Sequence, residues 1–384
     1  MIQRDAKTTL SNLATQFKAV AVVGPRQSGK TTLVRAVFSN KPYANLENPD
    51  TRSFAMDDPR GFLSMYPDGA ILDEIQRVPE LFSYLQQILD ESKDYGKFIL
   101  TGSNNFLIQE GISQSLAGRV GYLFLLPLSI NEIPKELPGS NHYIFNGGYP
   151  SLYNSSVEST LFYGNYIRTY VERDVRQIKN ISDLYAFERL IRLCAGRTGQ
   201  LLNMSSLAIE VGVDVKTINA WLGVLEAAFV VYRLQPFHKN FNKRLVKSPK
   251  LYFYDTGLAC ALLGIESSEQ LDLHPLRGSL FENLIITDLI KHRFNQGKPR
   301  NLYFWRDNTG NEIDVILEGA TTSVPVEIKS GKTITSLFLK GVSHWQKLSG
   351  REGGFIVYDG DSTQKRSNGV TVLPFKKTHE ITAT

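Results

Sequence analysis

Ten residues near the N-terminus, GPRQSGKTTL (24–33), constrain the fold of this chain more than any other stretch. They follow a short apolar run, AVAVV (19–23), and lead into a helical pattern, LVRAVF (33–38). A strand, a glycine-containing loop and a helix in this order form the setting in which G-x-x-x-x-G-K-[ST] binds nucleotide phosphates. An apolar run of this kind is also typical of a strand buried in a parallel sheet. The stretch therefore predicts an α/β domain with a nucleotide site.

The loop supplies the groups that a nucleoside triphosphate with Mg²⁺ requires. Gly24 and Gly29 let the backbone curl so that its N–H groups face phosphate oxygens. Lys30 brings positive charge to the β- and γ-phosphates, and the Thr31 hydroxyl is placed to hold Mg²⁺. We predict that ATP contacts the whole loop, which consists of Gly24, Pro25, Arg26, Gln27, Ser28, Gly29, Lys30, Thr31 and Thr32.

A second apolar strand, AILDEIQ (70–76), ends in two acidic residues. Asp73 at the end of a buried strand can hold Mg²⁺ through a water, and Glu74 can orient the water that attacks the γ-phosphate. The alternative is a strand-to-helix turn with an acidic cap. Because the phosphate-binding loop lies upstream, the catalytic interpretation is favoured.

Two further segments carry candidates for the same site. The strand KFILTGSNN (97–105) ends in Ser103 and Asn104, which can reach the γ-phosphate or the attacking water, or can simply form a turn. Arg119 follows a helical stretch, ISQSLAGR (112–119). It is a candidate arginine finger that acts on a neighbouring subunit. Alternatively, it is a positive charge that interacts favourably with the dipole at the C-terminal end of its helix.

These motifs resemble the AAA+ branch of P-loop ATPases, and more narrowly the prokaryotic AAA_14 family that is fused to a DUF4143 region. The resemblance rests on GPRQSGKTTL, ILDEIQ, LTGSNN, SLAGRV with LPLS after it, GGYP and YVERDV, in that order. It implies a P-loop AAA+ ATPase domain over residues 1–150, hydrolysis of ATP with Mg²⁺, and a homo-oligomer if Arg119 acts between subunits. A lid or linker helix is expected over residues 151–180.

The middle of the chain has the element order of a winged helix. Three helical patterns, at 184–196, 205–211 and 215–228, precede two strand-like runs, at 230–237 and 251–255, so we predict this domain over residues 181–255. Between the runs lies a basic segment without acidic residues, which suits contact with a DNA backbone. Its candidates are Lys239, Lys243, Arg244, Lys247 and Lys250. A solvated charge run and a protein-binding surface are the alternatives.

The C-terminal part carries a possible second catalytic site, with elements in the order α-β-β-β-α-β. Asp314 lies in the strand EIDVILEG (312–319), and the next strand, VPVEIKSG (324–331), presents Glu327 and Lys329 on one face. Glu282 lies in the preceding helix. Phosphodiester cleavage needs a divalent ion held by carboxylates, and a lysine can orient water or stabilise charge on phosphorus.

This E…D…E-x-K pattern resembles the PD-(D/E)XK nuclease superfamily, to which DUF4143 regions are thought to belong. The resemblance implies a nuclease-like domain over residues 256–384, with Asp314 and Glu327 as metal ligands, Lys329 as a catalytic residue and Glu282 as a further ligand. One departure is that Ile313, not proline, precedes Asp314. An ion pair on a solvated strand is the alternative for Glu327 and Lys329.

Composition limits the classes of function. The 384 residues are 42% hydrophobic and 21% charged, which is typical of a soluble multidomain protein, and no apolar run is long enough to span a membrane. The cysteines, Cys194 and Cys260, indicate a reducing, cytoplasmic setting. A net charge of +5 permits a DNA partner without demanding one.

Three functions remain open at this point. The first is an ATP-driven protein that binds duplex or branched DNA through its C-terminal half, with metal-dependent cleavage as an added capability. The second is a signalling-type nucleotide switch whose degenerate nuclease domain only binds DNA or protein. In the third, the C-terminal half is an interaction module without any DNA partner.

Overall fold

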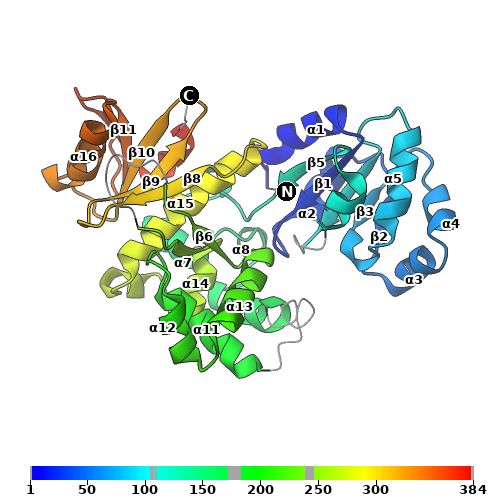
Figure 1. The fold of residues 1–384 in the computed structure, drawn as a ribbon, viewed down its shortest axis with the longest axis horizontal. Helices are drawn as coiled ribbons and strands as arrows, with labels where there is room; N and C mark the ends of the chain where they lie inside the picture. The colour runs from blue at the N-terminus through cyan, green and yellow to red at the C-terminus, as the bar shows by residue number, and fades with distance from the viewer. Residues whose placement is uncertain (1, 104–107, 109, 172–182, 238–245, 382–384) are drawn as a thin grey trace. The chain divides into compact units, whose positions relative to one another are not determined.

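The computed structural model describes residues 2–103, 108, 110–171, 183–237 and 246–381. The chain forms two compact units (Figure 1). Unit 1 consists of Met1–Leu128 with Arg293–Pro299, and unit 2 consists of Ser129–His292 with Arg300–Thr384. Within the described segments, no helix is both long and apolar enough to cross a membrane.

Unit 1 is built around a five-stranded parallel sheet in the order β2-β3-β4-β1-β5. The strands are β1 (Ala19–Val23), β2 (Tyr43–Asn45), β3 (Ile71–Asp73), β4 (Phe98–Gly102) and β5 (Val120–Phe124). The accompanying helices are α1 (Ala6–Gln16), α2 (Lys30–Val37), α3 (Pro49–Asp57), α4 (Pro59–Ser64) and α5 (Leu81–Glu91), with short turns at Ile75–Arg77 and Ile112–Leu116. Every residue of β1 and β4 is buried, as expected for central strands of a parallel sheet.

One core of unit 1 lies between the sheet and its first two helices. Apolar side chains of α1 and α2 pack on alternate residues of β1, among them Val20 and Val22, and on Ile71 and Ile99 of the neighbouring strands. Alternation explains this pattern, because every second side chain of a strand points to the same face. The predicted α/β architecture with a parallel sheet is confirmed.

Unit 2 begins with a helical layer. Its helices are α7 (Ser140–Asn146), α8 (Ser151–Asn154), α9 (Ser159–Tyr166), α11 (Leu184–Gly196), α12 (Met204–Val211), α13 (Val215–Ala227), α14 (Thr256–Leu262) and α15 (Arg277–Asn295), with turns at Ile130–Glu132, Ile167–Val171 and Glu269–Leu273. The side chains of Asp183, Asn203 and Asp214 accept hydrogen bonds from the first turns of α11, α12 and α13. Such caps fix where short helices begin.

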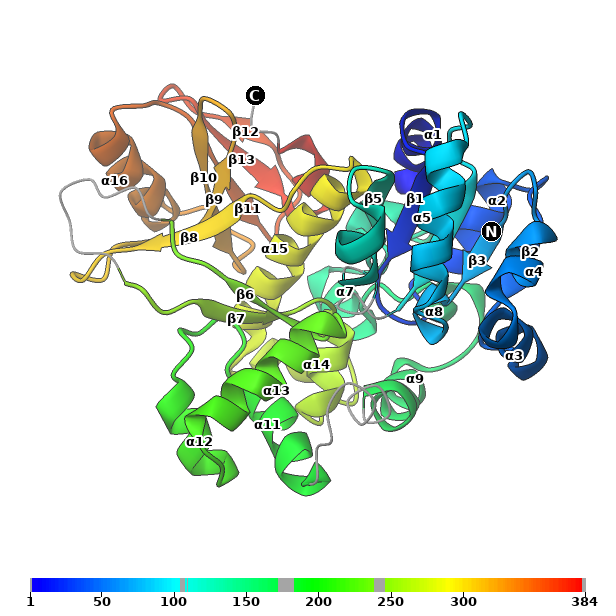
Figure 2. The same ribbon diagram turned by 45° about the vertical axis from the view of Figure 1, so that its right-hand side comes forward.

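A two-stranded antiparallel sheet lies between α13 and α14 in the chain. It consists of β6 (Val231–Leu234) and β7 (Lys250–Phe253), so three helices and a strand pair occur in the predicted order. Asn283 of α15 hydrogen-bonds to both backbone groups of Phe253, with its Oδ1 2.8 Å from the nitrogen and its Nδ2 2.7 Å from the oxygen. These hydrogen bonds attach the strand pair to α15, beside which it lies in Figure 2.

The C-terminal sheet of unit 2 has six strands in the order β12-β13-β11-β10-β9-β8. They are β8 (Leu302–Arg306), β9 (Glu312–Glu318), β10 (Ser323–Lys329), β11 (Gly354–Tyr358), β12 (Gln364–Lys365) and β13 (Val370–Pro374); α16 (Lys340–Ser349) and turns at Ser336–Leu339 and Phe375–Glu380 complete the domain. Trp345 and Val342 of α16 pack into two apolar clusters of this sheet. The structure contains the predicted α-β-β-β-α-β order and extends it by β12 and β13.

The GGYP stretch (147–150) is tied to the helical layer by a buried carboxylate. Asp255 accepts hydrogen bonds from the backbone nitrogen of Gly148 at 2.8 Å and from the hydroxyl of Tyr163 at 2.6 Å. Burial raises the pKa of Asp255, so the surrounding donors are needed to hold its charge. This stretch therefore has a structural role in unit 2.

Candidate functional site

The first candidate site lies at the carboxyl edge of the parallel sheet in unit 1. Strand β4 pairs with β1 on one side and with β3 on the other, all in the same direction. Since the carboxyl ends of parallel strands meet at one edge, the phosphate-binding loop, the Asp73–Glu74 pair and Ser103 come together there.

The loop after β1 is curled as a phosphate cradle requires. A Cβ on Gly24 would lie 2.0 Å from the carbonyl oxygen of Leu125, so only glycine fits. Gly29 has φ of 93° and Gln27 has φ of 60°, both in the left-handed region. Non-glycine residues adopt this conformation at a cost, which is commonly found at ligand-binding loops.

Lys30 and Ser28 are placed inside this loop. The Lys30 side chain is 5% exposed, and its Nζ donates to the carbonyl oxygens of Gly24 and Pro25 at 3.0 and 2.8 Å. The buried hydroxyl of Ser28 has no hydrogen-bond partner among the described residues. A phosphate oxygen would satisfy it, so the loop fits a nucleotide phosphate chain.

Asp73 is held by three hydroxyl groups. Thr31 Oγ1 lies 3.0 Å from Oδ2 of Asp73, the Tyr43 hydroxyl donates to the same oxygen at 2.6 Å, and the Thr101 hydroxyl donates to Oδ1. The two residues predicted to hold Mg²⁺, Thr31 and Asp73, are therefore in direct contact. A hydroxyl beside a buried carboxylate is a donor set of hard oxygens, which suits Mg²⁺.

Glu74 adopts a strained backbone next to Asp73. Its φ is 57° and ψ is 46°, in the left-handed region that a non-glycine residue rarely adopts. Its Oε2 accepts hydrogen bonds from the Ser103 hydroxyl at 3.1 Å and from the side-chain amide of Gln76. The carboxylate is thus fixed in one orientation at the end of β3. Asn104 lies outside the described residues.

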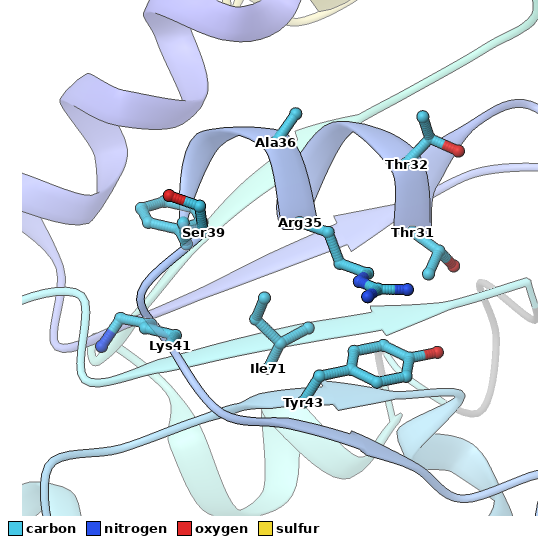
Figure 3. Close-up of a pocket in the computed structure, with 9 residues that line it drawn as sticks. Thr31, Thr32, Arg35, Ala36, Ser39, Lys41, Tyr43 and Ile71 are labelled. Atoms are coloured by element: carbon cyan, nitrogen blue, oxygen red, sulfur yellow. The ribbon is translucent and has the colours of Figure 1, made fainter. Parts of the chain in front are cut away.

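Tyr43 is a residue that sequence reasoning missed. It lies on β2, which pairs with β3, and it borders a pocket of about 500 Å³ beside α2. Figure 3 shows Thr31, Arg35 and Tyr43 turned toward the same space, and the Arg35 guanidinium lies 4.9 Å from the Tyr43 ring centroid. Burial, together with the hydrogen bond to Asp73, raises the pKa of Tyr43, so its hydroxyl remains a donor.

Arg119 forms an ion pair within its own chain. Its Nη2 lies 2.9 Å from Oδ2 of Asp90, and Nε pairs with the second oxygen. The geometry is bidentate, and the hydrogen bond from Arg119 lowers the pKa of Asp90. A role of Arg119 toward a neighbouring subunit therefore requires that this exposed pair opens.

The second candidate site lies on the C-terminal sheet of unit 2. Val315 of β9 pairs with Val326 of β10, so the next antiparallel pair along the strands is Asp314 and Glu327. The Oδ2 of Asp314 accepts a hydrogen bond from the backbone nitrogen of Ile328 at 2.7 Å. The two predicted metal ligands are brought together by strand register.

Lys329 contacts both acids of this pair. Its Nζ lies 2.5 Å from Oε2 of Glu327 and 3.5 Å from Oδ2 of Asp314. Burial and then the charge of Asp314 raise the pKa of Glu327 to about 9. Although burial opposes ionisation, Lys329 and Lys250 lower the pKa of Asp314. Asp314 therefore carries the charge near neutral pH, and Glu327 keeps its proton until a further cation arrives.

Gly341 of α16 completes the surroundings of Glu327. A Cβ at Gly341 would lie 1.7 Å from Oε1 of Glu327, so the absence of a side chain there leaves room for the carboxyl group. This close approach fixes Glu327 between β10 and α16.

Glu282 does not join the other two acids as a metal ligand. Its Oε1 accepts hydrogen bonds from the Tyr252 hydroxyl at 2.5 Å and from Lys250 Nζ at 3.1 Å. Burial raises the pKa of Glu282, and Lys250 opposes that shift. Among the described residues, no group of three or more acidic, histidine or cysteine side chains is arranged to hold a metal ion. Asp314 and Glu327 are the two predicted metal ligands that the strands bring together.

The structure corrects the prediction for Lys250. That lysine is 4% exposed, begins β7 and pairs with Glu282 and Glu312, so it cannot contact a DNA backbone from an exposed loop. Its side chain points inward because β7 packs on α15. Lys247 is exposed, as predicted. Lys239, Lys243 and Arg244 lie outside the described residues.

Comparison with known protein families divides the chain into three matches. An AAA domain (AAA_14) matches residues 16–134, a domain of unknown function (DUF8612) matches residues 139–269, and a second one (DUF4143) matches residues 277–378. The phosphate-binding loop and the Asp73–Glu74 pair lie within the first match. The chain is therefore an AAA-type P-loop ATPase.

Two curated relatives identify its family. The uncharacterized proteins Rv2008c of Mycobacterium tuberculosis and Mb2031c of Mycobacterium bovis are each 32% identical over 336 residues, which cover 86% of this chain and 74% of the relative. The chain belongs to their family. A solved Walker-type ATPase of Pyrococcus abyssi is 14% identical, with a TM-score of 0.44, over 68% of this chain and 96% of its own.

Proposed function

We propose that this ATPase acts on DNA, and that the site formed by Asp314, Glu327 and Lys329 in unit 2 engages the phosphodiester backbone with the help of a divalent ion. The observation that carries the proposal is the register of β9 and β10, which sets two carboxyl groups opposite each other with a lysine 2.5 Å from one of them. A carboxylate pair with an adjacent ammonium group supports metal-assisted phosphodiester chemistry.

In unit 1, each residue has a separate task toward ATP. Lys30 leaves the carbonyl oxygens of the loop and pairs with the phosphates, while Ser28 donates to a phosphate oxygen. Thr31 and Asp73 would hold Mg²⁺, which neutralises charge on the phosphates. Glu74, fixed by Ser103 and Gln76, orients the attacking water. The Lys30→Ala variant tests this assignment, because persistent turnover would refute it.

In unit 2, Asp314 and Glu327 would hold the divalent ion, which supplies an activated water and charge neutralisation at phosphorus. Lys329 lies next to both acids, so it can donate to a phosphate oxygen or orient the water. Exposed Lys247, near the start of β7, adds a contact to the DNA backbone.

A cleavage and binding assay tests the proposal. Linear, forked and four-way DNA are incubated with Mg²⁺ or Mn²⁺ and the wild type, and in parallel with the double variant Glu327→Ala, Lys329→Ala. Cutting by the wild type that the double change abolishes supports the proposal in full. The absence of DNA binding at moderate salt would overturn it.

One observation favours a second candidate. Glu282 is paired with Lys250 and Tyr252, so the site has two carboxyl groups for a metal ion where the sequence predicted three. A nucleotide switch whose nuclease-like domain only binds DNA fits that arrangement. DNA binding without cutting, in the same assay, supports this second function.

We propose further that the ATPase works as a homo-oligomer in which Arg119 acts on the nucleotide of a neighbouring subunit. The support is its place on the surface of unit 1, where it forms an ion pair with the exposed Asp90. Light scattering with and without ATP tests the assembly, and a monomer under both conditions would refute it.

A further inference from the structure

Lys250 is a buried charged residue of unit 2. It is 4% exposed, and its Nζ lies 3.1 Å from Oε1 of Glu282 and contacts a carboxylate oxygen of Glu312. A lysine is rarely buried in this way unless its charge is paired, and here two carboxylates pair it.

The surrounding groups hold the ammonium in place. Tyr252, two residues later on the same face of β7, donates to the same oxygen of Glu282. The Phe304 ring centroid lies 5.7 Å from Lys250 Nζ, within the range of a cation–π contact. Asn283 hydrogen-bonds to the backbone of Phe253, so the strand that carries Lys250 is held against the helix that carries Glu282.

Lys250 also belongs to the electrostatic neighbourhood of the candidate metal site. Its charge acts on Asp314, as does that of Lys329. The neighbourhood thus contains four carboxyl groups and two ammonium groups, with Arg306 at the edge of Glu312, 3.2 Å away. Once Glu327 has also released its proton, removal of Lys250 would leave four negative carboxylates beside the positive Lys329 and Arg306, and a divalent cation would neutralise that excess.

We propose that Lys250 is a resident cation, which pairs with Glu282 and Glu312 and thereby keeps Glu282 out of the metal site formed by Asp314 and Glu327. The proposal rests on the metal site of the proposed function and adds the residue that restricts it to Asp314 and Glu327. Lys250 acts through Glu282, so it is a positioning residue.

The test measures Mn²⁺ binding to the nucleotide-free, full-length protein by the electron paramagnetic resonance signal of free Mn²⁺. The variants are Lys250→Met and Lys250→Gln, since the glutamine amide still donates to Glu282 and preserves the fold better. We expect Mn²⁺ to bind at least about tenfold more tightly to both, because three carboxyl groups replace two. The matched control is Lys365→Met, an exposed lysine of β12, which leaves Mn²⁺ affinity unchanged.

Two further variants assign the effect. In Lys250→Gln, Glu282→Gln the gain in affinity disappears, because Glu282 supplies the added ligand. In Asp314→Asn the binding at this site is lost, which separates it from Mn²⁺ held in unit 1. Circular dichroism confirms that each variant is folded.

The outcomes distinguish the inference from the proposed function. Equal or weaker Mn²⁺ binding in folded Lys250→Gln overturns the inference, whatever the wild type does. If the Lys250 variants bind Mn²⁺ and the wild type does not, the inference is supported. The same result refutes metal-dependent cleavage by the wild type. If neither binds, both are overturned.

Discussion

Each of the two candidate sites contains a buried carboxylate at a strand, but the groups that surround the two carboxylates are of opposite kinds. Asp73 in unit 1 is held by neutral hydroxyl groups of Thr31, Tyr43 and Thr101, so its charge stays available to a metal ion. Asp314 in unit 2 lies beside the ammonium group of Lys329, and the charge of Lys250 also acts on it. Positive groups of the protein itself therefore already compensate its negative charge. Hydroxyl donors preserve a cation site, whereas ammonium groups compete for it.

The largest expected effect concerns the lysine of unit 1. Lys30→Ala removes the charge that pairs with the phosphates, so we expect ATP turnover to fall at least about 10³-fold, to background. Steady-state phosphate release measures it. Lys30→Arg is a comparison variant that keeps the positive charge in a side chain of different shape. Wild-type turnover in Lys30→Ala would contradict the assignment of the site.

The next effect tests Arg119. If it completes the site of a neighbouring subunit, Arg119→Ala lowers kcat by about 10³-fold, the lower range for an arginine finger. Asp90→Asn is the control, because it breaks the exposed ion pair while leaving the arginine, and it should change kcat by less than about twofold. Equal, small effects of both changes would assign Arg119 a structural role only.

An intermediate effect follows from the pKa of Glu327, which burial and Asp314 raise to about 9. The pKa of Glu327 is higher in the folded than in the unfolded state, so its contribution lowers the stability of the protein as the pH rises from about 4.5 toward 9. Glu327 also releases a proton when a metal ion binds. We expect Mn²⁺ affinity to increase up to about tenfold per pH unit between pH 7 and 9. Calorimetric titration in two buffers of different ionisation enthalpy measures the released proton.

The variant Glu327→Gln separates the two parts of that prediction. It should lose the pH-dependent Mn²⁺ affinity, and its unfolding temperature should decline less than that of the wild type from pH 7 to 9. A pH-independent Mn²⁺ affinity in the wild type would show that Glu327 is ionised already.

The smallest effect tests the hydroxyl donors of unit 1. Tyr43→Phe removes one hydrogen bond to Asp73, worth about 1 kcal/mol, so we expect kcat to change by about fivefold and the Mg²⁺ dependence to shift. ATP turnover against Mg²⁺ concentration measures both. Tyr66→Phe, whose ring packs edge-on against Phe62, is the matched control. Identical Mg²⁺ dependence in the wild type and Tyr43→Phe would exclude a role for this hydroxyl.

The difference between the sites also explains what the sequence could reveal. The phosphate-binding loop and the Asp73–Glu74 pair are local motifs, so their residues can be found without a sheet order. Tyr43 escaped notice because its contact with Asp73 depends on β2 lying beside β3, which no local pattern encodes. The strands of the second site were predictable from alternation, and their register then brought Asp314 and Glu327 together.

Lys250 and Glu282 show where such reasoning fails. The basic run 238–250 reads as one exposed segment, and nothing in its letters reveals that its last lysine begins a buried strand. Glu282 was placed correctly in its helix, but its partner was decided by packing of β7 on α15. The charged residues of unit 2 could therefore be identified from the sequence, but the pairing of each acidic residue with a particular lysine could not.

The central claim, that this ATPase acts on DNA through unit 2, is tested most directly by ATP turnover with and without four-way DNA. The wild type and the double variant Glu327→Ala, Lys329→Ala are compared at several salt concentrations, because backbone contacts weaken as salt rises. We predict that DNA stimulates turnover of the wild type and that the double variant loses this stimulation. Equal turnover of the wild type with and without DNA, or equal stimulation of both proteins, would contradict the claim.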